Sequence, residues 1–280
     1  MKKDELSTAL EELRHRPVVT ESRDYARRWE ESRARAAWWR GVLLGPVGSS
    51  AVALVIACVA WFEVPRAPSH PVIATKVGET RALTLSDGSR VVLDTGSQLS
   101  VDFTADARDI DLVEGQAHFE VAKEARRPFR VRTKSAEVVA VGTMFDVAAL
   151  PARTTVTLIE GRVSVRAIAG DPRVEALTPG ERVGIDETGQ FQVEKAVKLD
   201  NVTAWQRGNL VIDDAVLPDA LGIMNRYSTT HIVVRGEALQ SRHISGVFRI
   251  GDVETEVLVL ERYFGLKEIA RSADEIVLER

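Results

Sequence analysis

The chain has 280 residues, 45% of them hydrophobic and 28% charged, and its formal net charge at pH 7 is −4. Its single cysteine, Cys58, excludes a disulfide framework. From residue 63 onward acidic residues outnumber basic ones, 33 to 27, so this larger part lacks the basic surface that nucleic-acid binding requires.

The segment Gly41–Phe62 contains 22 residues and no charge. A helix of that length, at about 1.5 Å per residue, covers a hydrocarbon core of about 30 Å. Aromatic and basic residues flank it in the pattern of a membrane interface, namely Arg33, Arg35, Trp38, Trp39, Arg40 and Trp61. We expect a single-pass membrane protein, with residues 1–40 on the cytoplasmic side and the residues after the span outside.

Three alternatives to a membrane span remain open. A buried soluble helix would rarely be this long without a polar side. A cleaved signal peptide would need a leading region of about 40 residues, against a usual total of 15–30. In a lipoprotein Cys58 would be acylated, because Val55–Cys58 loosely resembles a lipobox. In the favoured reading Cys58 is a small side chain within the span.

Residues 1–40 have the pattern of an amphipathic helical arm. Leu6, Leu10 and Leu13 recur at helical spacing, and Tyr25 and Trp29 follow Pro17. Forty residues are too few for a solid independent core, so these five apolar side chains are the candidate partner-binding residues. The alternative is a tail without a partner, disordered or on the membrane surface. Residues 63–71 contain a proline-rich stretch, VPRAPSH, which predicts an extended linker.

Residues 72–195 predict a β domain with little helix. Short alternating apolar runs are separated by a recurring local unit, a leucine followed by any residue, then usually an acid, then a glycine. The unit ends at Gly88, Gly115, Gly161 and Gly180, each able to adopt the positive φ of a tight turn. Its irregular spacing excludes a strict repeat. We therefore expect a roll-like or solenoid-like β domain.

Residues 199–280 predict a compact α+β module. Strands are expected at Leu210–Ile212, Ile232–Val234 and Ile244–Phe248, with a closing hairpin of Leu266–Ala270 and Glu275–Leu278. Apolar residues at helical spacing predict two helices, listed as Leu217, Leu221, Met224 and Tyr227 for the first and Val253, Val257, Leu260 and Phe264 for the second. The expected order is βαββαββ, and the whole chain is mainly β with this α+β module at its end.

Few residues carry recognisable chemistry. No nucleophile elbow, phosphate loop or dinucleotide fingerprint is present, and the histidines show no metal-ligand spacing, so neither a metal nor a cofactor is expected. The alternation around His118 predicts that it faces solvent. One bond stands out: in VAVGTMFDV the Thr143 hydroxyl could attack the Gly142 carbonyl if the backbone there is strained. The alternative is a strand with a glycine bulge.

Several blocks together resemble the outer domain of FecR-type anti-sigma regulators. They are LTLSDGSRVVLDTGSQLSV, GQAHFEVAKEARRPFRV, VAVGTMFDV, VTLIEGRVSV and LTPGE, in the order that the family has them. The C-terminal module, with ISGVF at 244–248, resembles a secretin/TonB short N-terminal domain.

The resemblance implies an anti-sigma factor that acts as a relay. The cytoplasmic arm would hold an extracytoplasmic-function sigma factor, and the periplasmic part would receive a signal, commonly from a TonB-dependent outer-membrane receptor. Proteolysis would then release the arm. The resemblance also implies self-cleavage between Gly142 and Thr143, and no metabolic enzyme activity. The competing reading is a membrane-tethered periplasmic scaffold or binding module without a sigma-factor partner.

Overall fold

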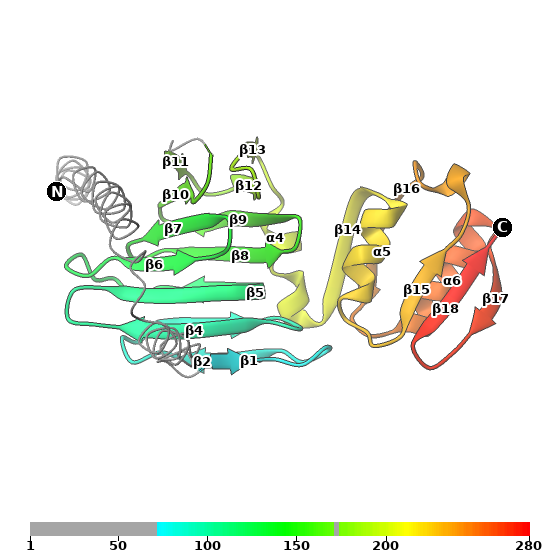
Figure 1. The fold of residues 1–280 in the computed structure, drawn as a ribbon, viewed down its shortest axis with the longest axis horizontal. Coiled ribbons are helices and arrows are strands. Elements are labelled where there is room, and N and C mark those ends of the chain that lie inside the picture. The colour runs from blue at the N-terminus through cyan, green and yellow to red at the C-terminus, as the bar shows by residue number, and fades with distance from the viewer. Residues whose placement is uncertain (1–71, 171–173) are drawn as a thin grey trace, which may run out of the picture. The chain divides into compact units, whose positions relative to one another are not determined.

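A computed structural model describes residues 72–170 and 174–280 (Figure 1). The predicted arm, transmembrane helix and linker, residues 1–71, lie outside the described residues. Within the described residues no helix combines the length and the apolar character needed to cross a membrane. Their buried apolar side chains form two clusters, one between Val91 and Ile185 and the other between Leu210 and Leu278. Each cluster is the core of a separate part of the fold.

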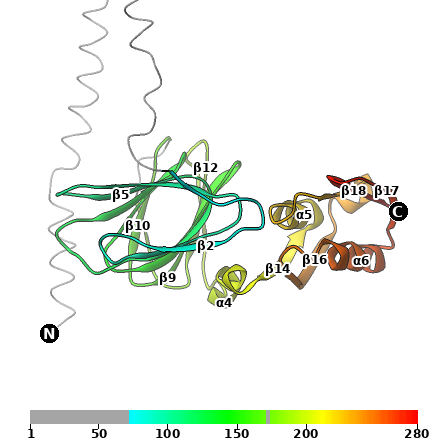
Figure 2. The same ribbon diagram turned by 90° about the horizontal axis from the view of Figure 1, so that it is seen from below.

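The first part is a sheet of thirteen strands among the described residues. It confirms that this region is mainly β, and the predicted solenoid-like stacking takes the form of one curled sheet (Figure 2). The strands are β1 (Val72–Ala74), β2 (Arg81–Thr84), β3 (Arg90–Leu93), β4 (Gln98–Phe103), β5 (Arg108–Glu120), β6 (Phe129–Arg132), β7 (Ala136–Ala140), β8 (Met144–Leu150), β9 (Arg153–Glu160), β10 (Val163–Ala167), β11 (Val174–Leu177), β12 (Arg182–Asp186) and β13 (Phe191–Glu194).

The sheet bends along strand β5, whose two halves pair with different strands. Its first half pairs with β4 and β6, and its second half pairs with β3 and β8. Gly115 lies where the partners change, with φ +90°, and a Cβ there would come within 2.5 Å of the Ser97 Cα. Only glycine fits so close an approach. The two halves of the sheet enclose the first apolar core between them.

The prediction that His118 faces solvent is wrong. Its side chain is 3% exposed, although it alternates with the core residues Ala117 and Phe119. The second face of β5 is covered as well, because Trp205 lies beside Asp146, the cross-strand neighbour of His118. Alternation shows that a side chain points away from one core, and a later segment can still bury it.

The four glycines of the recurring unit all have positive φ, between +84° and +90°. Gly88, Gly161 and Gly180 lie in turns between strands, as the sequence predicts. Gly115 differs, because it lies inside the thirteen-residue strand β5 rather than in a turn. The same local motif therefore produces a hairpin turn at Gly88, turns between strands that do not pair with each other at Gly161 and Gly180, and a bend within one strand at Gly115.

The second part contains two small sheets and two longer helices. Its strands and helices follow in the order βαββαββ that the sequence predicts, preceded by two short helical turns. The elements are α4 (Leu199–Val202), η2 (Ala204–Arg207), β14 (Asn209–Val216), α5 (Leu217–Asn225), β15 (His231–Val234), η3 (Glu237–Leu239), β16 (His243–Arg249), α6 (Val253–Phe264), β17 (Lys267–Arg271) and β18 (Glu275–Glu279). β14 pairs with β16, and β18 lies between β15 and β17.

Local sequence explains where the two longer helices begin and end. Pro218 occupies the first turn of α5, where its missing N–H costs little. The Asp252 carboxylate caps the N-terminus of α6 by accepting a hydrogen bond from the Thr255 N–H at 3.2 Å. Gly265, with φ +69°, ends α6 as the sequence predicts.

Candidate functional site

The bond between Gly142 and Thr143 lies in the short turn that joins β7 to β8. Gly142 has φ +65°, in the left-handed region that other residues rarely adopt. A Cβ on Gly142 would come within 2.3 Å of Lys123 Cγ and 3.2 Å of Lys123 Cα. The turn therefore requires glycine, both for its backbone conformation and for the close approach of Lys123.

The Thr143 side chain is buried, and its hydroxyl makes no hydrogen bond within the described residues. The side chain is 5% exposed, and its Oγ1 has no hydrogen-bond partner among the described residues. Its backbone carbonyl accepts a hydrogen bond from the Val121 N–H at 2.9 Å. On the other side, a Cβ on Gly161 would come within 2.7 Å of the Thr143 methyl group. Because buried hydroxyls are normally paired, this one is a candidate for a chemical role.

The turn brings together what an acyl shift requires. A free hydroxyl lies on the residue that follows a glycine carbonyl, within a backbone segment of unusual conformation. The glycine bulge considered as the alternative would explain the positive φ, but it would not explain a buried hydroxyl without a partner. The structure thus keeps both predicted residues, Gly142 and Thr143, as a candidate site.

A second group of buried polar side chains connects β3 to the end of α5. Asp94 is fully buried, and its Oδ2 accepts a 2.6 Å hydrogen bond from the Tyr227 hydroxyl. The Arg226 guanidinium lies 3.4 Å from the same oxygen, and the Thr95 hydroxyl donates to the Arg226 carbonyl at 3.1 Å. Burial raises the pKa of Asp94, although Tyr227 and Arg226 act in the opposite direction. Burial also raises the pKa of the Tyr227 phenol, and the Asp94 charge adds to that effect.

Asp146 extends this group along the outer face of β8. Burial raises the pKa of Asp146 to about 7, and the 2.8 Å hydrogen bond from the Gln116 amide opposes that shift. The indole N–H of Trp205 lies beside the second carboxyl oxygen without making a well-formed hydrogen bond. The neighbouring His118 has its pKa lowered, chiefly by burial. These polar residues were missed at the sequence level, because each one alone looks like an ordinary residue of a strand or turn.

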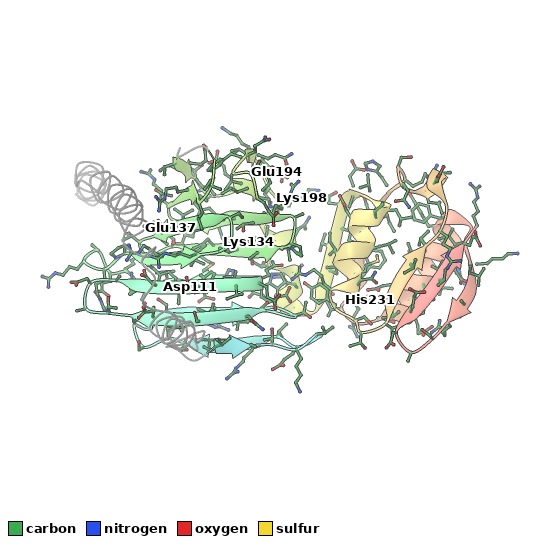
Figure 3. All side chains as sticks on the ribbon, viewed as in Figure 1. Asp111, Lys134, Glu137, Glu194, Lys198 and His231 are labelled. Atoms are coloured by element: carbon green, nitrogen blue, oxygen red, sulfur yellow. The ribbon has the colours of Figure 1, made fainter. Side chains whose placement is uncertain are left out.

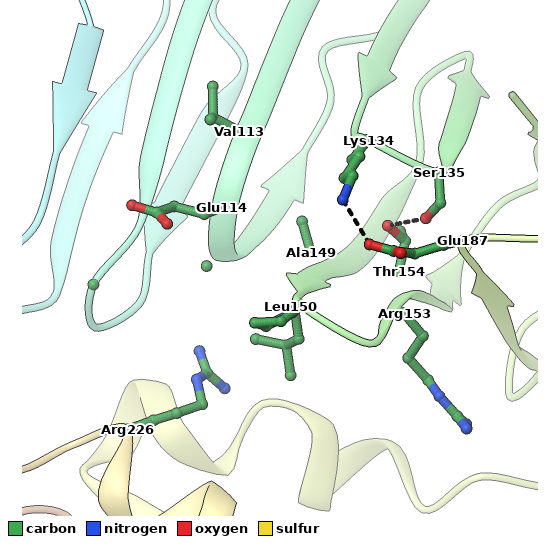
Figure 4. Close-up of a pocket in the computed structure, with 13 residues that line it drawn as sticks. Val113, Glu114, Lys134, Ser135, Ala149, Leu150, Arg153, Thr154, Glu187 and Arg226 are labelled. Carbon is green, nitrogen blue, oxygen red and sulfur yellow. Dashed lines mark hydrogen bonds and ion pairs between the residues drawn. The ribbon is translucent and has the colours of Figure 1, made fainter.

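A depression of about 440 Å³ opens near the turns that follow β6 and β8 (Figure 4). In it Lys134 Nζ pairs with Glu187 at 2.6 Å, and the Ser135 hydroxyl donates to Thr154 Oγ1 at 2.8 Å. It is lined by Gly96, Val113, Glu114, Gly115, Lys134, Ser135, Ala149, Leu150, Pro151, Arg153, Thr154, Glu187 and Arg226. The lining carries charges of both signs, and Lys134 is paired with Glu187, so it selects no class of ligand.

Other charged side chains are spread over the surface as ion pairs rather than gathered in one site (Figure 3). Glu137 pairs with Arg132 and Arg166, and Lys198 pairs with Asp213. No group of three or more potential metal ligands occurs within residues 72–170 and 174–280. The predicted partner-binding residues Leu6, Leu10, Leu13, Tyr25 and Trp29 lie outside the described residues.

The family model described as FecR protein matches residues 71–164, a range that contains β1 to β9 and the Gly142–Thr143 turn. Residues 71–164 are therefore a FecR domain. Among curated proteins none matches the chain.

The chain is also similar to solved structures. Two crystal structures of a candidate anti-sigma factor from Parabacteroides distasonis ATCC 8503 superimpose on it with a TM-score of 0.66 and 26% sequence identity in each case. The similarity covers 75% and 74% of this chain and 98% of the other chain. It therefore extends well beyond the residues that match the FecR model.

Proposed function

We propose that this protein regulates a sigma factor across the bacterial inner membrane. In this proposal residues 1–40 bind an extracytoplasmic-function sigma factor in the cytoplasm, and residues 41–62 cross the membrane once. Residues 72–280 receive a periplasmic signal from a TonB-dependent outer-membrane receptor, and proteolysis releases the arm. The main support is the FecR match together with the similarity to a candidate anti-sigma factor over three quarters of the chain.

The C-terminal part offers a route for the incoming signal. β14 and β16 pair only with each other among the described strands, so each leaves one edge free. Val247 on β16 is 68% exposed beside those edges. An extended segment of a receptor can add to such an edge through main-chain hydrogen bonds.

The sigma-factor proposal is tested by co-expressing the full chain with each extracytoplasmic-function sigma factor of the source organism. We expect one of these sigma factors to co-purify with the chain, and we expect replacement of Leu6, Leu10 and Leu13 by Asp to abolish co-purification and alter transcription from the sigma-dependent promoter. Replacing the exposed Val247 by Asp is the matched control, and should leave sigma binding unchanged. If the arm variants alter neither binding nor any transcript, the tethered scaffold replaces the regulator as the explanation.

We further propose that the chain cleaves itself between Gly142 and Thr143. Thr143 Oγ1 attacks the Gly142 carbonyl carbon, a C–O bond forms as the C–N bond breaks, and the hydroxyl proton ends on the freed Thr143 amine. Water then hydrolyses the ester, leaving a carboxylate on Gly142 and restoring the Thr143 hydroxyl. The observation that carries this proposal is the buried, unpartnered Thr143 hydroxyl beside a left-handed glycine.

Self-cleavage is tested by making the chain in a purified translation system that contains no protease. Wild-type protein should yield two fragments, residues 1–142 and 143–280, identified by mass spectrometry. Thr143→Ala should remain intact, and Thr143→Ser should still be cut because it keeps the hydroxyl. A single intact wild-type band after complete folding would eliminate this activity.

A further inference from the structure

One buried ion pair lies beside the candidate cleavage turn and has no role in the functions described above. The side chain of Arg108 is fully buried, and its partner Asp87 is 2% exposed, with 2.7 Å between the guanidinium and the carboxylate. Burying such a pair is costly unless every remaining donor and acceptor finds a partner. The other contacts of this pair therefore indicate which segment of the chain it holds in place.

Arg108 holds the loop of residues 121–128 by its carbonyl groups. The guanidinium donates to the Ala122 carbonyl at 3.1 Å, to the Arg127 carbonyl at 3.1 Å and to the Glu124 carbonyl at 3.4 Å. It also lies over the Phe129 ring, 5.4 Å from its centroid. One side chain thus fixes three carbonyls of the same loop.

Asp87 and Ser89 complete the attachment from the β2–β3 turn. Asp87 accepts from the Ser89 hydroxyl at 2.6 Å, and the same hydroxyl accepts from the Ala122 N–H at 3.0 Å. Although burial acts in the opposite direction, hydrogen bonds from Ser89 and Arg108 lower the pKa of Asp87, so the carboxylate stays charged. Ala122 is consequently held at both its N–H and its carbonyl.

The residues on either side of Ala122 are the ones that contact the cleavage turn. The Val121 N–H donates to the Thr143 carbonyl at 2.9 Å, and the Lys123 stem lies directly against Gly142. Any displacement of Ala122 would therefore move both contacts of the Gly142–Thr143 bond. Positioning of this kind has large effects on rate, because small displacements of the reacting atoms remove the productive geometry.

We propose that Arg108, Asp87 and Ser89 form a positioning clamp, which holds residues 121–123 against the Gly142–Thr143 bond in the conformation needed for self-cleavage. The inference rests on the proposed self-cleavage. None of the three side chains touches the reacting atoms, so they are positioning residues rather than catalytic ones. The clamp also explains why the segment LSDGS, at residues 85–89, combines a tight turn with a buried acid and a buried hydroxyl.

The test compares two buried serines of the β domain, Ser89 and Ser135. Ser89→Ala removes the acceptor of the Ala122 N–H and leaves the Arg108–Asp87 pair in place. Ser135→Ala is the matched control, because Ser135 is buried and bonded to Thr154 within the same domain but has no contact with residues 121–128. Pulse-chase of the full chain with a C-terminal tag gives the cleavage rate, and thermal unfolding of the Thr143→Ala forms gives the stability.

We expect Ser89→Ala to slow cleavage by about tenfold or more, because one buried hydrogen bond is lost. Ser135→Ala should change the cleavage rate by less than about twofold at similar stability. In the Thr143→Ala background, Ser89→Ala should also make hydrogen exchange faster at the Val121 amide, which donates to the carbonyl of residue 143. Suppose that wild type is cut and that both variants keep the wild-type rate, or that both slow in proportion to lost stability. The clamp is then refuted, and self-cleavage stands. If wild type is not cut, self-cleavage is refuted and the clamp with it.

Discussion

At the scale of single residues, Gly142 is constrained in two ways that can be separated. Gly142→Ala would place a Cβ within 2.3 Å of Lys123 Cγ in a backbone at φ +65°. Gly180→Ala is the control, because Gly180 has φ +87° but nothing within 4 Å of a Cβ. Both variants lose about 1 kcal/mol to the left-handed backbone. We expect Gly142→Ala to lose roughly a further 1–3 kcal/mol to crowding, and to be cut more slowly. Equal losses in urea unfolding would contradict the role assigned to Lys123.

Asp146 predicts an unusual dependence of stability on pH. Its pKa in the folded state, about 7, lies above the ordinary value of 3.8, so the folded state binds the extra proton and stability falls as pH rises through 7. Between pH 6.5 and 8 unfolded carboxyls are already ionised, and unfolded histidine goes from about half protonated to neutral. Over that window Asp146 should therefore remove about 1 kcal/mol from the free energy of unfolding.

Glu256 is a second carboxyl group with which Asp146 can be compared. It is buried in α6, and its pKa is also raised to about 7, chiefly by burial. We expect Asp146→Asn and Glu256→Gln each to remove part of the slope between pH 6.5 and 8, and the double variant to flatten it. His118, whose pKa is lowered, acts in the opposite direction and offsets part of the fall in the lower half of this window, where unfolded histidine loses its proton. Denaturant unfolding at a series of pH values measures the slope, and an unchanged slope in Asp146→Asn would show that this carboxyl is ionised throughout.

At the scale of elements, the contact between β3 and the end of α5 depends on one phenol. Tyr227→Phe leaves the buried Asp94 carboxylate without its 2.6 Å donor, and the Arg226 guanidinium at 3.4 Å cannot replace it fully. We expect a loss of about 1–3 kcal/mol in the free energy of unfolding of the compact unit His70–Arg280. Tyr263→Phe is the control, because Tyr263 is 63% exposed, and should change stability by less than about 0.5 kcal/mol. Equal effects of the two substitutions would mean that Tyr227 makes no net contribution through its hydroxyl.

The elements were predictable where local sequence determines them. The helix that begins near Pro218, the helix that ends at Gly265 and the positive φ of the turn glycines all follow from short-range rules. The curl of the sheet about Gly115 was not predictable, because it depends on Ser97 lying against β5 from another strand. His118 was misplaced for the same reason, since the segment that buries its face comes more than eighty residues later in the chain.

The candidate site was predictable in part. Gly142 and Thr143 stand out in the sequence because chemistry links a glycine carbonyl to the hydroxyl that follows it. Their supporting residues do not, because Arg108, Asp87 and Ala122 are brought to the turn only by the pairing of distant strands. Arg108 gave a usable signal, because an arginine at a core-facing position of an alternating strand indicates a specific partner. Charged residues are rarely buried without one.

At the scale of the whole molecule, a cut after Gly142 would divide the sheet without dividing the fold. Strands β1 to β7 belong to the first fragment, and β8 to β18 belong to the second. β5 pairs with β8 from Gly115–Ala149 to Glu120–Met144, and β7 pairs with β10 from Ala136–Ala167 to Ala140–Val163. Phe119 and Phe145 also stack across the division, with ring centroids 5.1 Å apart. The two fragments share one core, and neither can bury its apolar face without the other.

We therefore predict that the cleaved chain remains a single particle. A tag on the C-terminus should retain the fragment of residues 1–142 through native washing, because separation would expose the core shared by β5, β7, β8 and β10. Washing in urea should release that fragment at about the concentration at which uncut Thr143→Ala unfolds. The fragment that is retained carries the proposed span and arm, so a relay through it would require force or further proteolysis rather than the cut alone. Loss of the first fragment during native washing would show that cleavage itself separates the two parts, and would make the cut the releasing step.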